Sequence, residues 1–570
     1  MRAHTPINQG MGERCMTAHI DKARLSTPPS RAFWRAASAT ITGAALVAGL
    51  AWSAAAQAQA PCIDVTRPIS VEEQRLPNKL NALNANPFAV DILGASGFTH
   101  FEQDFIDEIC GLNGKVAPSD YNSAFARMTE QGTRLWRAAV DRVQGRKVTQ
   151  SDDLGRWPTL ARGDDRPLYW ARTTMTRALN RWVPMFPLSA AELTALQLQL
   201  ERTSRGQLDI KFLAGSQYKR MIVSGFDVFT LPNPGTNGTG MRNSNPSAAT
   251  VLTLDGVRTR LPDGTTLIIE AYVLPVNYPP FALGMVEDTV GPWMMPGPMR
   301  VDASVSMSQG GANQFWLEMW NGRFHGPTSG NDNIALAPCG NATTRRPQVN
   351  DCDVYPPERW MRLKPGWENY VERPLGGSQP WQRDTPPQFT VTSLPVAAMF
   401  NEHTEFGVPR PPNAGGPPPG AFQVLWHTNF TRFAGCDAVN GASSGTTSTV
   451  NGNQTPVAQE HIFPPSPSPT PPLVDDCAQS GGGGNYLSNE VAYRNTNMRD
   501  IFGLQIPAGH IHTPVVNNFA ATPAGTAPLY TDSTYEAWRD AIVQQGRNLF
   551  FAVGRNLGPR PALPCATGPC

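Results

Sequence analysis

Two residues that could carry out acyl transfer lie near the end of the chain, Ser488 and His512, within the glycine-rich stretch 481–514. A serine hydroxyl attacks a carbonyl carbon when a base takes its proton and donors stabilise the oxyanion. Histidine is the commonest base for this task. The stretch therefore predicts a nucleophile, Ser488, and a general base, His512. Serine in such a loop is more often a turn residue, so the pair needs support from elsewhere in the chain.

A metal site is the other chemistry that this stretch suggests. His510 and His512 are two residues apart and could face one way on an extended segment. No third ligand follows nearby, and the chain has no CxxC motif or close Cys/His cluster. We therefore predict no metal and no cofactor.

Composition limits the class of protein that could hold this pair. The chain has 570 residues, a formal net charge of +1 and 16% charged residues, so we expect no nucleic-acid partner, which would require a basic face. The 51 glycines and 54 prolines indicate long loops. The length suffices for two or more domains.

The N-terminus has the pattern of an export signal. Arg31 and Arg35 precede an apolar run at 44–52, and small residues at 56–60 favour cleavage after Ala60. Residues 1–60 are thus predicted to be a signal peptide, with an uncleaved anchor as the alternative. Beyond it no run of 18 apolar residues occurs, so we expect a periplasmic or secreted protein with no stable membrane span.

The cysteine count agrees with an oxidising compartment. Of nine cysteines only Cys15 lies in the leader, which leaves an even number, eight. Sequence proximity suggests four disulfides, although eight cysteines allow many connectivities: Cys62–Cys110, Cys339–Cys352, Cys436–Cys477 and Cys565–Cys570.

Residues 61–210 have the pattern of a helical region, to which the sequence assigns no function. Apolar residues recur at spacings near 3.6 over 125–143, which predicts an amphipathic helix. Ser189 and Glu192 form a capping-box pattern at the start of another helix. Four arginines surround an aromatic pair and indicate either an anion site or a solvated helix face: Arg166, Arg172, Arg177 and Arg181.

Residues 211–555 have a different pattern, with short apolar strands that alternate with helices. Strands are predicted at 221–223, 267–273, 301–307 and 422–426, and helices from Asn245 and over 535–553. This alternation predicts an α/β sheet whose functional groups gather at the carboxyl ends of the strands. Two segments, 325–388 and 401–480, are predicted to be loop insertions, and 556–570 to be a tail rich in proline and cysteine.

Short motifs in this region, taken in order, resemble type I pyroglutamyl peptidase (pyrrolidone-carboxylate peptidase), a family of cysteine peptidases. They run through residues 218–553 and are interrupted by both insertions. The motifs are SGFDVF at 224–229 with NPS at 245–247, LPV at 274–276, Gly310-Gly311 before Glu318, TSLPV at 392–396, GNYLSN at 484–489 with Tyr493, and AGHIHTP at 508–514.

The resemblance implies a fold and a role for each matching residue. It implies a three-layer α/β/α, phosphorylase-like domain. Glu318 and His512 fall on the catalytic acid and base of the family, and Ser488 falls on its nucleophilic cysteine. The implied substrate-binding residues, which would line the pyroglutamyl pocket, are Phe226, Phe229, Tyr486 and Leu487.

Serine in place of cysteine leaves the activity open. A hydroxyl depends on its base far more than a thiol does, but Ser488, His512 and Glu318 together form a sensible hydrolase triad. The first hypothesis is therefore an exported omega peptidase that cleaves a small pyroglutamyl or related peptide. The second is an inactive relative that serves as a binding or scaffold protein. The third is an envelope-associated protein that meets a partner through its helices and proline-rich insertions. The sequence does not predict the oligomeric state.

Overall fold

The structure is a computed structural model that describes residues 61–146, 160–311, 313–324, 328–334, 387–404, 408–412, 420–433, 450–451, 471–473 and 476–558. The predicted signal peptide, most of both predicted insertions and most of the tail lie outside these residues. The disulfide predicted between Cys62 and Cys110 is confirmed. The other three predicted pairs involve side chains outside the described residues.

The helical region predicted after residue 61 is present. Its longest helix, α3, covers the predicted amphipathic segment and buries Met128, Leu135 and Trp136. The capping box of Ser189 and Glu192 is also confirmed, because each side chain bonds the other's backbone N–H at the start of α5. The helices of this region are α1 (Phe88–Ser96), α2 (His100–Cys110), α3 (Tyr121–Val143), α4 (Arg166–Arg181) and α5 (Ala190–Thr203), preceded by the short η1 (Glu73–Arg75).

The solvated helix face, one of the two interpretations of the arginine cluster, is wrong for two of its members. Arg166 is fully buried and Arg172 is 2% exposed. Both have carboxylate partners: Arg166 Nη2 lies 2.6 Å from Asp164 Oδ2, and Arg172 Nη2 lies 2.5 Å from Asp227 Oδ2. Buried charge is tolerated only when it is paired and hydrogen-bonded, and these pairings were not visible in the helical pattern.

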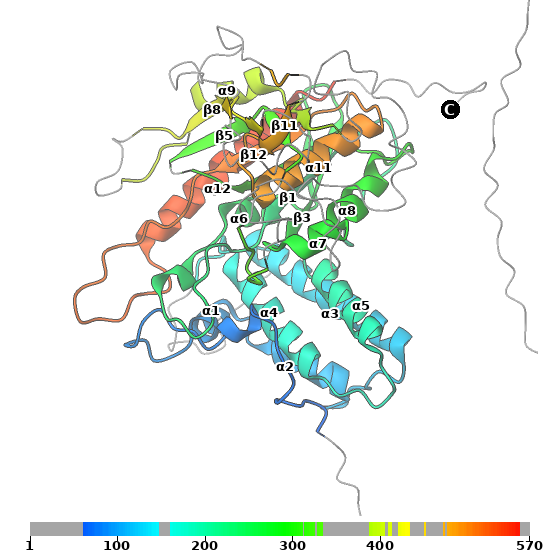
Figure 1. The fold of residues 1–570 in the computed structure, drawn as a ribbon, viewed down its shortest axis with the longest axis vertical. Coiled ribbons are helices and arrows are strands. Elements are labelled where there is room, and N and C mark those ends of the chain that lie inside the picture. The colour runs from blue at the N-terminus through cyan, green and yellow to red at the C-terminus, as the bar shows by residue number, and fades with distance from the viewer. Residues whose placement is uncertain are drawn as a thin grey trace, which may run out of the picture. The chain divides into compact units, whose positions relative to one another are not determined.

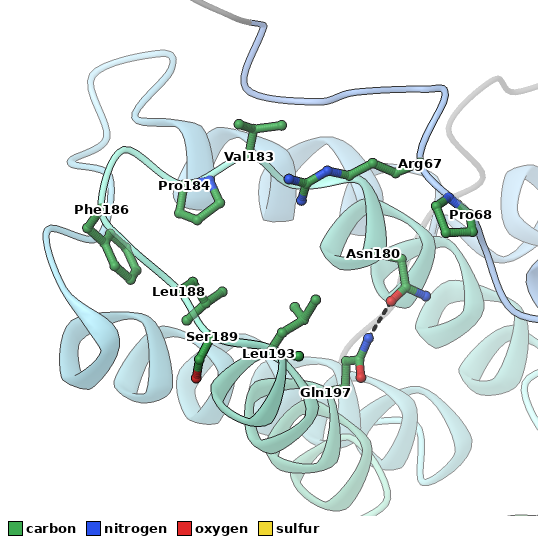
Figure 2. Close-up of a pocket in the computed structure, with 11 residues that line it drawn as sticks. Arg67, Pro68, Asn180, Val183, Pro184, Phe186, Leu188, Ser189, Leu193 and Gln197 are labelled. Carbon is green, nitrogen blue, oxygen red and sulfur yellow. Dashed lines mark hydrogen bonds between the residues drawn. The ribbon is translucent and has the colours of Figure 1, made fainter.

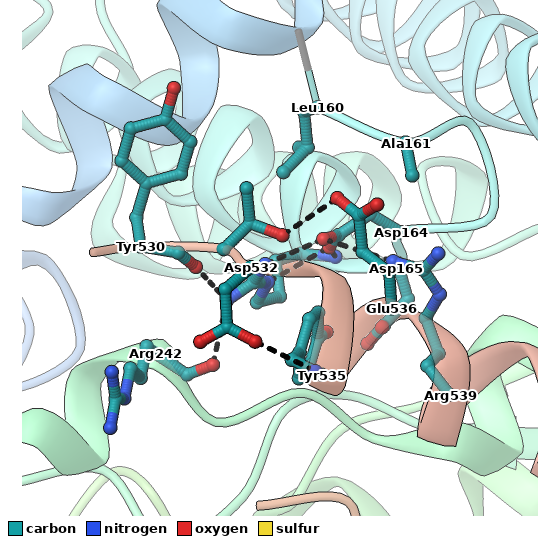
Figure 3. A network of polar contacts seen from close by, with 12 residues as sticks. Leu160, Ala161, Asp164, Asp165, Arg242, Tyr530, Asp532, Tyr535, Glu536 and Arg539 are labelled. Atoms are coloured by element: carbon teal, nitrogen blue, oxygen red, sulfur yellow. Dashed lines mark hydrogen bonds and ion pairs between the residues drawn. The ribbon is translucent and has the colours of Figure 1, made fainter. Parts of the chain in front are cut away.

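A buried set of ionisable side chains, which we call the Asp164 network, links α4 to the C-terminal helix α12 (Ser533–Arg555): Asp164, Asp165, Arg166 and Arg539. Figure 3 shows Asp164, Asp165 and Arg539. Arg166 also donates to the backbone carbonyls of Arg242 and Tyr530, at 2.7 and 2.9 Å. The network therefore joins segments that are far apart in the sequence.

The second region is built on a seven-stranded sheet with the order β2-β3-β1-β4-β12-β5-β8. The four strands from β3 to β12 are mutually parallel, β2 is antiparallel to β3, and β5 is antiparallel to β12 but parallel to β8. All four predicted strands and the α/β class are confirmed. The strands are β1 (Tyr218–Phe226), β2 (Val257–Arg260), β3 (Thr266–Leu274), β4 (Ala303–Gln309), β5 (Gln314–Glu318), β8 (Gln423–His427) and β12 (Ala508–Thr513).

Helices cover both faces of this sheet (Figure 1). Alternate residues of β1 enter different cores: Val223 packs with α12 on one face, and Ile222 packs with Val491 of α11 on the other. This division follows from the alternation of side chains along a strand. The covering helices include α6 (Pro246–Leu252), α7 (Tyr278–Ala282), α8 (Met285–Met294), α9 (Val396–Thr404) and α11 (Leu487–Ile501). The finer phosphorylase-like assignment stays a prediction.

Smaller elements lie outside the main sheet. They are the pair β6 (Trp320–Gly322) and β7 (Phe389–Val391), the three-stranded set β9 (Thr431–Phe433), β10 (Val450–Asn451) and β11 (Cys477–Ser480), and the short η2 (Thr239–Arg242). Among the described residues, no helix has the length and apolar character needed to cross a membrane.

A pocket of about 550 Å³ lies in the helical region, between the end of α4 and the start of α5 (Figure 2). Arg67, Phe186 and Leu193 are among the residues that line it, and Asn180 accepts a hydrogen bond from Gln197 at its edge. None of its lining residues belongs to the predicted site.

Candidate functional site

Polar side chains from five elements meet at the carboxyl ends of β4 and β12. We call this set the site cluster: Ser308 (β4), Glu318 (β5), His427 (β8), Ser488 (α11), and His510 and His512 (β12). Pairing of β12 with both β4 and β5 brings its two histidines beside Ser308 and Glu318. Three of the six, Ser488, His512 and Glu318, are the predicted catalytic residues.

Glu318 and His512 are brought into direct contact. His512 Nδ1 lies 2.5 Å from Glu318 Oε1, with Glu318 fully buried and His512 5% exposed. The second carboxylate oxygen is occupied by a histidine that the sequence analysis did not single out, because His427 Nδ1 lies 2.6 Å from Glu318 Oε2. The indole of Trp316 stacks on His427 with ring centroids 4.7 Å apart.

The electrostatics of this triple contact fix the charge of the carboxyl group. Burial alone would favour the neutral acid, but His427 and His512 outweigh burial and hold the pKa of Glu318 well below its ordinary value. An ionised carboxylate only accepts hydrogen bonds, so the hydrogen must lie on Nδ1 of each histidine. A neutral His512 therefore has its lone pair on Nε2, which is the tautomer of a general base.

Ser488 is half-buried in the first turn of α11, two residues after the N-cap Tyr486. Its hydroxyl oxygen accepts a hydrogen bond of 2.8 Å from Ser308 Oγ, which in turn lies 2.8 Å from His510 Nε2. In the described part of the chain, no hydrogen bond joins Ser488 to His512. Ser488 thus lies in the same cluster as the other two predicted residues, but its direct contact is with Ser308.

Glycines are needed where the backbone approaches the cluster. A Cβ atom at Gly482 would lie 2.0 Å from Glu318 Oε2, and one at Gly310 would lie 2.6 Å from the Cβ of His512. Real Cβ atoms do not approach other atoms so closely, so any side chain at these positions would displace the acid or the base. The glycine-rich character that drew attention to 481–484 therefore has a steric cause at Gly482.

The first turn of α11 supplies backbone donors beside Ser488. The first N–H groups of a helix have no intrahelical partner, and Tyr486 provides no side-chain cap. The helix is anchored by Asn489, whose side chain accepts from Gly322 N at 2.9 Å and donates to the carbonyls of Gly322 and Phe324 at 2.7 and 2.8 Å. Such a fixed row of N–H groups could stabilise an oxyanion that forms at Ser488.

The four predicted substrate-binding residues lie in one apolar cluster next to α11: Phe226, Phe229, Tyr486 and Leu487. Phe226 is buried and stacks parallel to Phe281, whereas Phe229 and Tyr486 are partly buried, with ring centroids 5.4 Å apart. Phe229 and Tyr486 are therefore the members of the set that can meet a ligand, and Phe226 and Leu487 pack behind them.

The structure adds three residues to the site that the sequence analysis did not assign to it. Ser308 and His510 stand in period-two patterns, ASVSMSQ and AGHIHT, which could have shown that each shares a face with its neighbours two positions away. His427 follows a predicted strand, but nothing local pairs it with Glu318. Among the described residues, no group of three or more His, Cys, Asp or Glu side chains is placed to hold a metal ion.

Comparison with known proteins gives two matching family models. The one described as the PA0049 N-terminal domain matches residues 54–201, and the one described as the PA0049 C-terminal domain matches residues 220–517. A Pseudomonas aeruginosa protein named "Uncharacterized protein PA0049" is 43% identical over 559 residues, which cover 90% of this chain and 96% of that protein.

Solved structures of pyroglutamyl peptidases are also similar to the chain, but weakly. A mutant pyrrolidone carboxyl peptidase from Pyrococcus furiosus is 15% identical, covers 59% of this chain and 99% of its own, and has a TM-score of 0.28. Pyroglutamyl peptidase I from Bacillus amyloliquefaciens is 13% identical, covers 58% and 94%, and has the same TM-score. The assignment of the α/β fold is therefore based on the strand order and registers of this chain and not on these similarities.

Proposed function

The chain belongs to the PA0049 family, and we propose that it is a hydrolase that cleaves an amide bond with Ser488 as nucleophile, His512 as general base and Glu318 as the residue that orients the base. The observation that carries the proposal is the 2.5 Å hydrogen bond between His512 Nδ1 and Glu318 Oε1, which leaves Nε2 able to accept a proton. The same pairing of a carboxylate with a catalytic histidine operates in serine hydrolases of unrelated folds.

The steps follow from the positions of these groups. Ser488 Oγ would bond to the carbonyl carbon of the substrate while its proton passes to His512 Nε2, and the carbonyl electron pair would move to the oxygen. First-turn N–H groups of α11 would stabilise that oxyanion. His512 would then return the proton to the leaving amine, and water would release the acyl group by the same steps.

The substrate class in this proposal comes from the motifs and from the aromatic residues beside Ser488. The motif order resembles pyroglutamyl peptidases, and Phe229 and Tyr486 would contact a small cyclic or apolar acyl group. We therefore propose an N-terminal pyroglutamyl peptide or a related amide as the substrate. The disulfide at Cys62–Cys110 supports export to the periplasm or the medium, since such bonds persist in oxidising compartments.

A second candidate is a binding protein that keeps the fold without catalysis. The observation that favours it is the direct partner of Ser488, which is Ser308 and not His512. In this arrangement the hydrogen of Ser488 has no acceptor among the described residues. Catalytic hydrogen bonds often tighten only in the substrate complex, so reactivity of Ser488 distinguishes the two candidates.

Labelling with a fluorophosphonate probe tests the first candidate, because the probe reacts only with an activated serine. We expect mass spectrometry to find the probe on Ser488 of the purified protein and on no residue of the Ser488→Ala variant. Folding of both proteins is checked by their thermal unfolding curves.

Absence of labelling on well-folded native protein would contradict the hydrolase proposal. The variant Ser488→Cys then separates the remaining options. If it cleaves a pyroglutamyl amide, the pocket has been kept and only the nucleophile is unreactive, which would support the second candidate.

A further inference from the structure

The strand β4 carries a row of serines on the face that meets α11. Because side chains alternate along a strand, every second residue of β4 lies on one face. The residues of the opposite face enter the apolar core with α12, namely Ala303, Val305 and Met307. Those facing α11 are Ser304, Ser306 and Ser308, all buried. Hydroxyl groups in such a row must find partners inside the protein.

His510 provides partners for two of these serines. Its Nδ1 lies 2.8 Å from Ser306 Oγ, and its Nε2 lies 2.8 Å from Ser308 Oγ. Ser308 Oγ lies 2.8 Å from Ser488 Oγ. A continuous chain of hydrogen bonds therefore runs from Ser306 through His510 and Ser308 to the proposed nucleophile.

The protonation state of His510 limits the direction in which the hydrogen bonds of this series can be donated. Burial and the neighbouring His512 lower the pKa of His510 well below its ordinary value, so the ring is neutral. A neutral imidazole donates from one nitrogen and accepts at the other. If Ser306 donates to Nδ1, the Nε2 hydrogen goes to Ser308, and the hydroxyl hydrogen of Ser308 goes to Ser488.

The surroundings of the two histidines favour this direction over its reverse. Both oxygens of Glu318 are taken, by His512 and by His427, so the positive charge of a protonated ring is stabilised at His512. His510 has only hydroxyl partners on its two nitrogens. His512 is therefore the proposed acceptor of the Ser488 proton, and Ser308 is the donor to Ser488 Oγ.

We propose that His510 and Ser308 are positioning residues that donate a hydrogen bond to Ser488 Oγ, turn its proton toward His512 and stabilise the negative charge that develops on the oxygen. The inference rests on the proposed function. When the Ser488 O–H bond breaks, its proton goes to His512 Nε2 and its oxygen bonds to the carbonyl carbon, whose electron pair moves to the carbonyl oxygen. Ser308 and His510 keep their protons throughout.

A thiol at position 488 reports on this donor without any need for hydrolase activity. In the Ser488→Cys variant, the pKa of the thiol is read from the pH dependence of its alkylation by iodoacetamide, followed by mass spectrometry of the peptide that contains position 488. A donated hydrogen bond favours the thiolate, so adding Ser308→Ala or His510→Phe is expected to raise the thiol pKa by about one unit.

Ser304→Ala is the matched control, because Ser304 lies on the same face of β4 but bonds Asn495 of α11 instead of Ser488. It should leave the thiol pKa unchanged, and Ser308→Thr, which keeps a hydroxyl, should restore the low value. In the serine protein, Ser308→Ala should slow fluorophosphonate labelling about 10- to 100-fold. The pH dependence of labelling should keep its shape, because Ser308 and His510 keep their protons throughout.

A thiol pKa that does not respond to Ser308→Ala or to His510→Phe would overturn the proposal. This outcome differs from failure of the hydrolase proposal, in which native Ser488 would not react with the fluorophosphonate although the thiol pKa still responded to both variants. An equal shift with Ser304→Ala would show a general loosening of β4 and would likewise overturn it.

Discussion

Two buried polar clusters, the site cluster and the Asp164 network, differ in the kind of proton that they hold. In the Asp164 network, guanidinium groups pair with carboxylates, and arginine does not lose its proton in proteins. In the site cluster, two histidines contact one carboxylate, and serine hydroxyls contact a third histidine. An imidazole can take up and release a proton during a reaction, which a guanidinium cannot do.

One residue of each cluster, Arg166 and His512, differs from the other in its remaining capacity for hydrogen bonds. Arg166 is fully buried, and its Nε, Nη1 and Nη2 all have acceptors within the protein. His512 has no hydrogen bond on Nε2 among the described residues, and Ser488 of the same cluster is only half-buried. Burial of charge therefore does not identify a site. A functional site is better identified by a buried histidine that has an unused acceptor nitrogen and shares a cluster with a partly exposed nucleophile.

The largest effect is expected from Glu318→Gln, which keeps the shape of the residue but removes its charge. The amide can no longer accept from both Nδ1 hydrogens, so His512 loses the tautomer that leaves Nε2 free. We expect the labelling rate of Ser488 by the fluorophosphonate to fall about 10³- to 10⁴-fold. Thermal unfolding of the variant separates this effect from misfolding. A fall of less than tenfold would mean that the carboxylate has a structural role like that of Asp164.

The next effect is expected in the Asp164 network. Arg166→Met leaves Asp164 with a weaker partner, Arg539 at 3.5 Å, and leaves two backbone carbonyls without their donor. Removal of one member of a buried ion pair typically lowers the free energy of unfolding by about 3–5 kcal/mol. Urea unfolding measures this loss of stability. The labelling rate of the protein that remains folded should stay at the native value.

Arg137→Met is the matched control for this prediction. Its ion pair with Asp209 is 2.7 Å long, but the arginine side chain is 57% exposed. A surface pair contributes about 0–1 kcal/mol to the free energy of unfolding. This variant should therefore unfold at nearly the same urea concentration as the native protein. Equal destabilisation by the two variants would contradict the assignment of Arg166 to a buried network.

The smallest effect is expected at Asp165, a member of the Asp164 network whose carboxyl group has a raised pKa. Burial, followed by the carboxylate of Asp164, raises the pKa of Asp165 from 3.8 to about 7, and its Oδ1 has no partner among the described residues. The folded state therefore holds a proton that the unfolded state has lost between pH 4 and 7, so this group makes stability fall across that range and level off above it.

Asp165→Asn should remove that contribution. Relative to the native protein, the variant should gain about 3 kcal/mol in the free energy of unfolding as pH rises from 4.5 to 7.5. Urea unfolding at the two pH values measures the difference. A constant difference between variant and native protein would show that Asp165 stays ionised in the fold.

Local patterns in the sequence predicted much of the fold correctly. The 3.6-residue apolar spacing gave α3, the Ser189–Glu192 pair gave the start of α5, and short β-branched runs gave β1 and β3. These signals depend on neighbours within one turn or one strand. The order of the motifs also placed Glu318 in the same site as His512, although 194 residues separate them.

Contacts that depend on strand order could not be predicted. His427 reaches Glu318 because β8 pairs with β5 in a register that aligns the two residues, and a predicted insertion separates them in the sequence. Ser308 meets His510 because β12 inserts between β4 and β5. Arg172 finds Asp227 at the end of β1, in the other region of the molecule. No local pattern in the sequence identifies any of these partners.

The alternation along β4 has a consequence for how the site assembles. A slip of one residue between β4 and its neighbours would reverse its two faces, so that methyl and thioether groups would meet Ser488 while three hydroxyls entered the apolar core with α12. Both changes are costly, so a misregistered sheet would be unstable as well as inactive. The sheet therefore acquires its correct register and the site acquires its arrangement of hydroxyl groups in the same step of folding. Intermediates with incomplete strand pairing should have no activity.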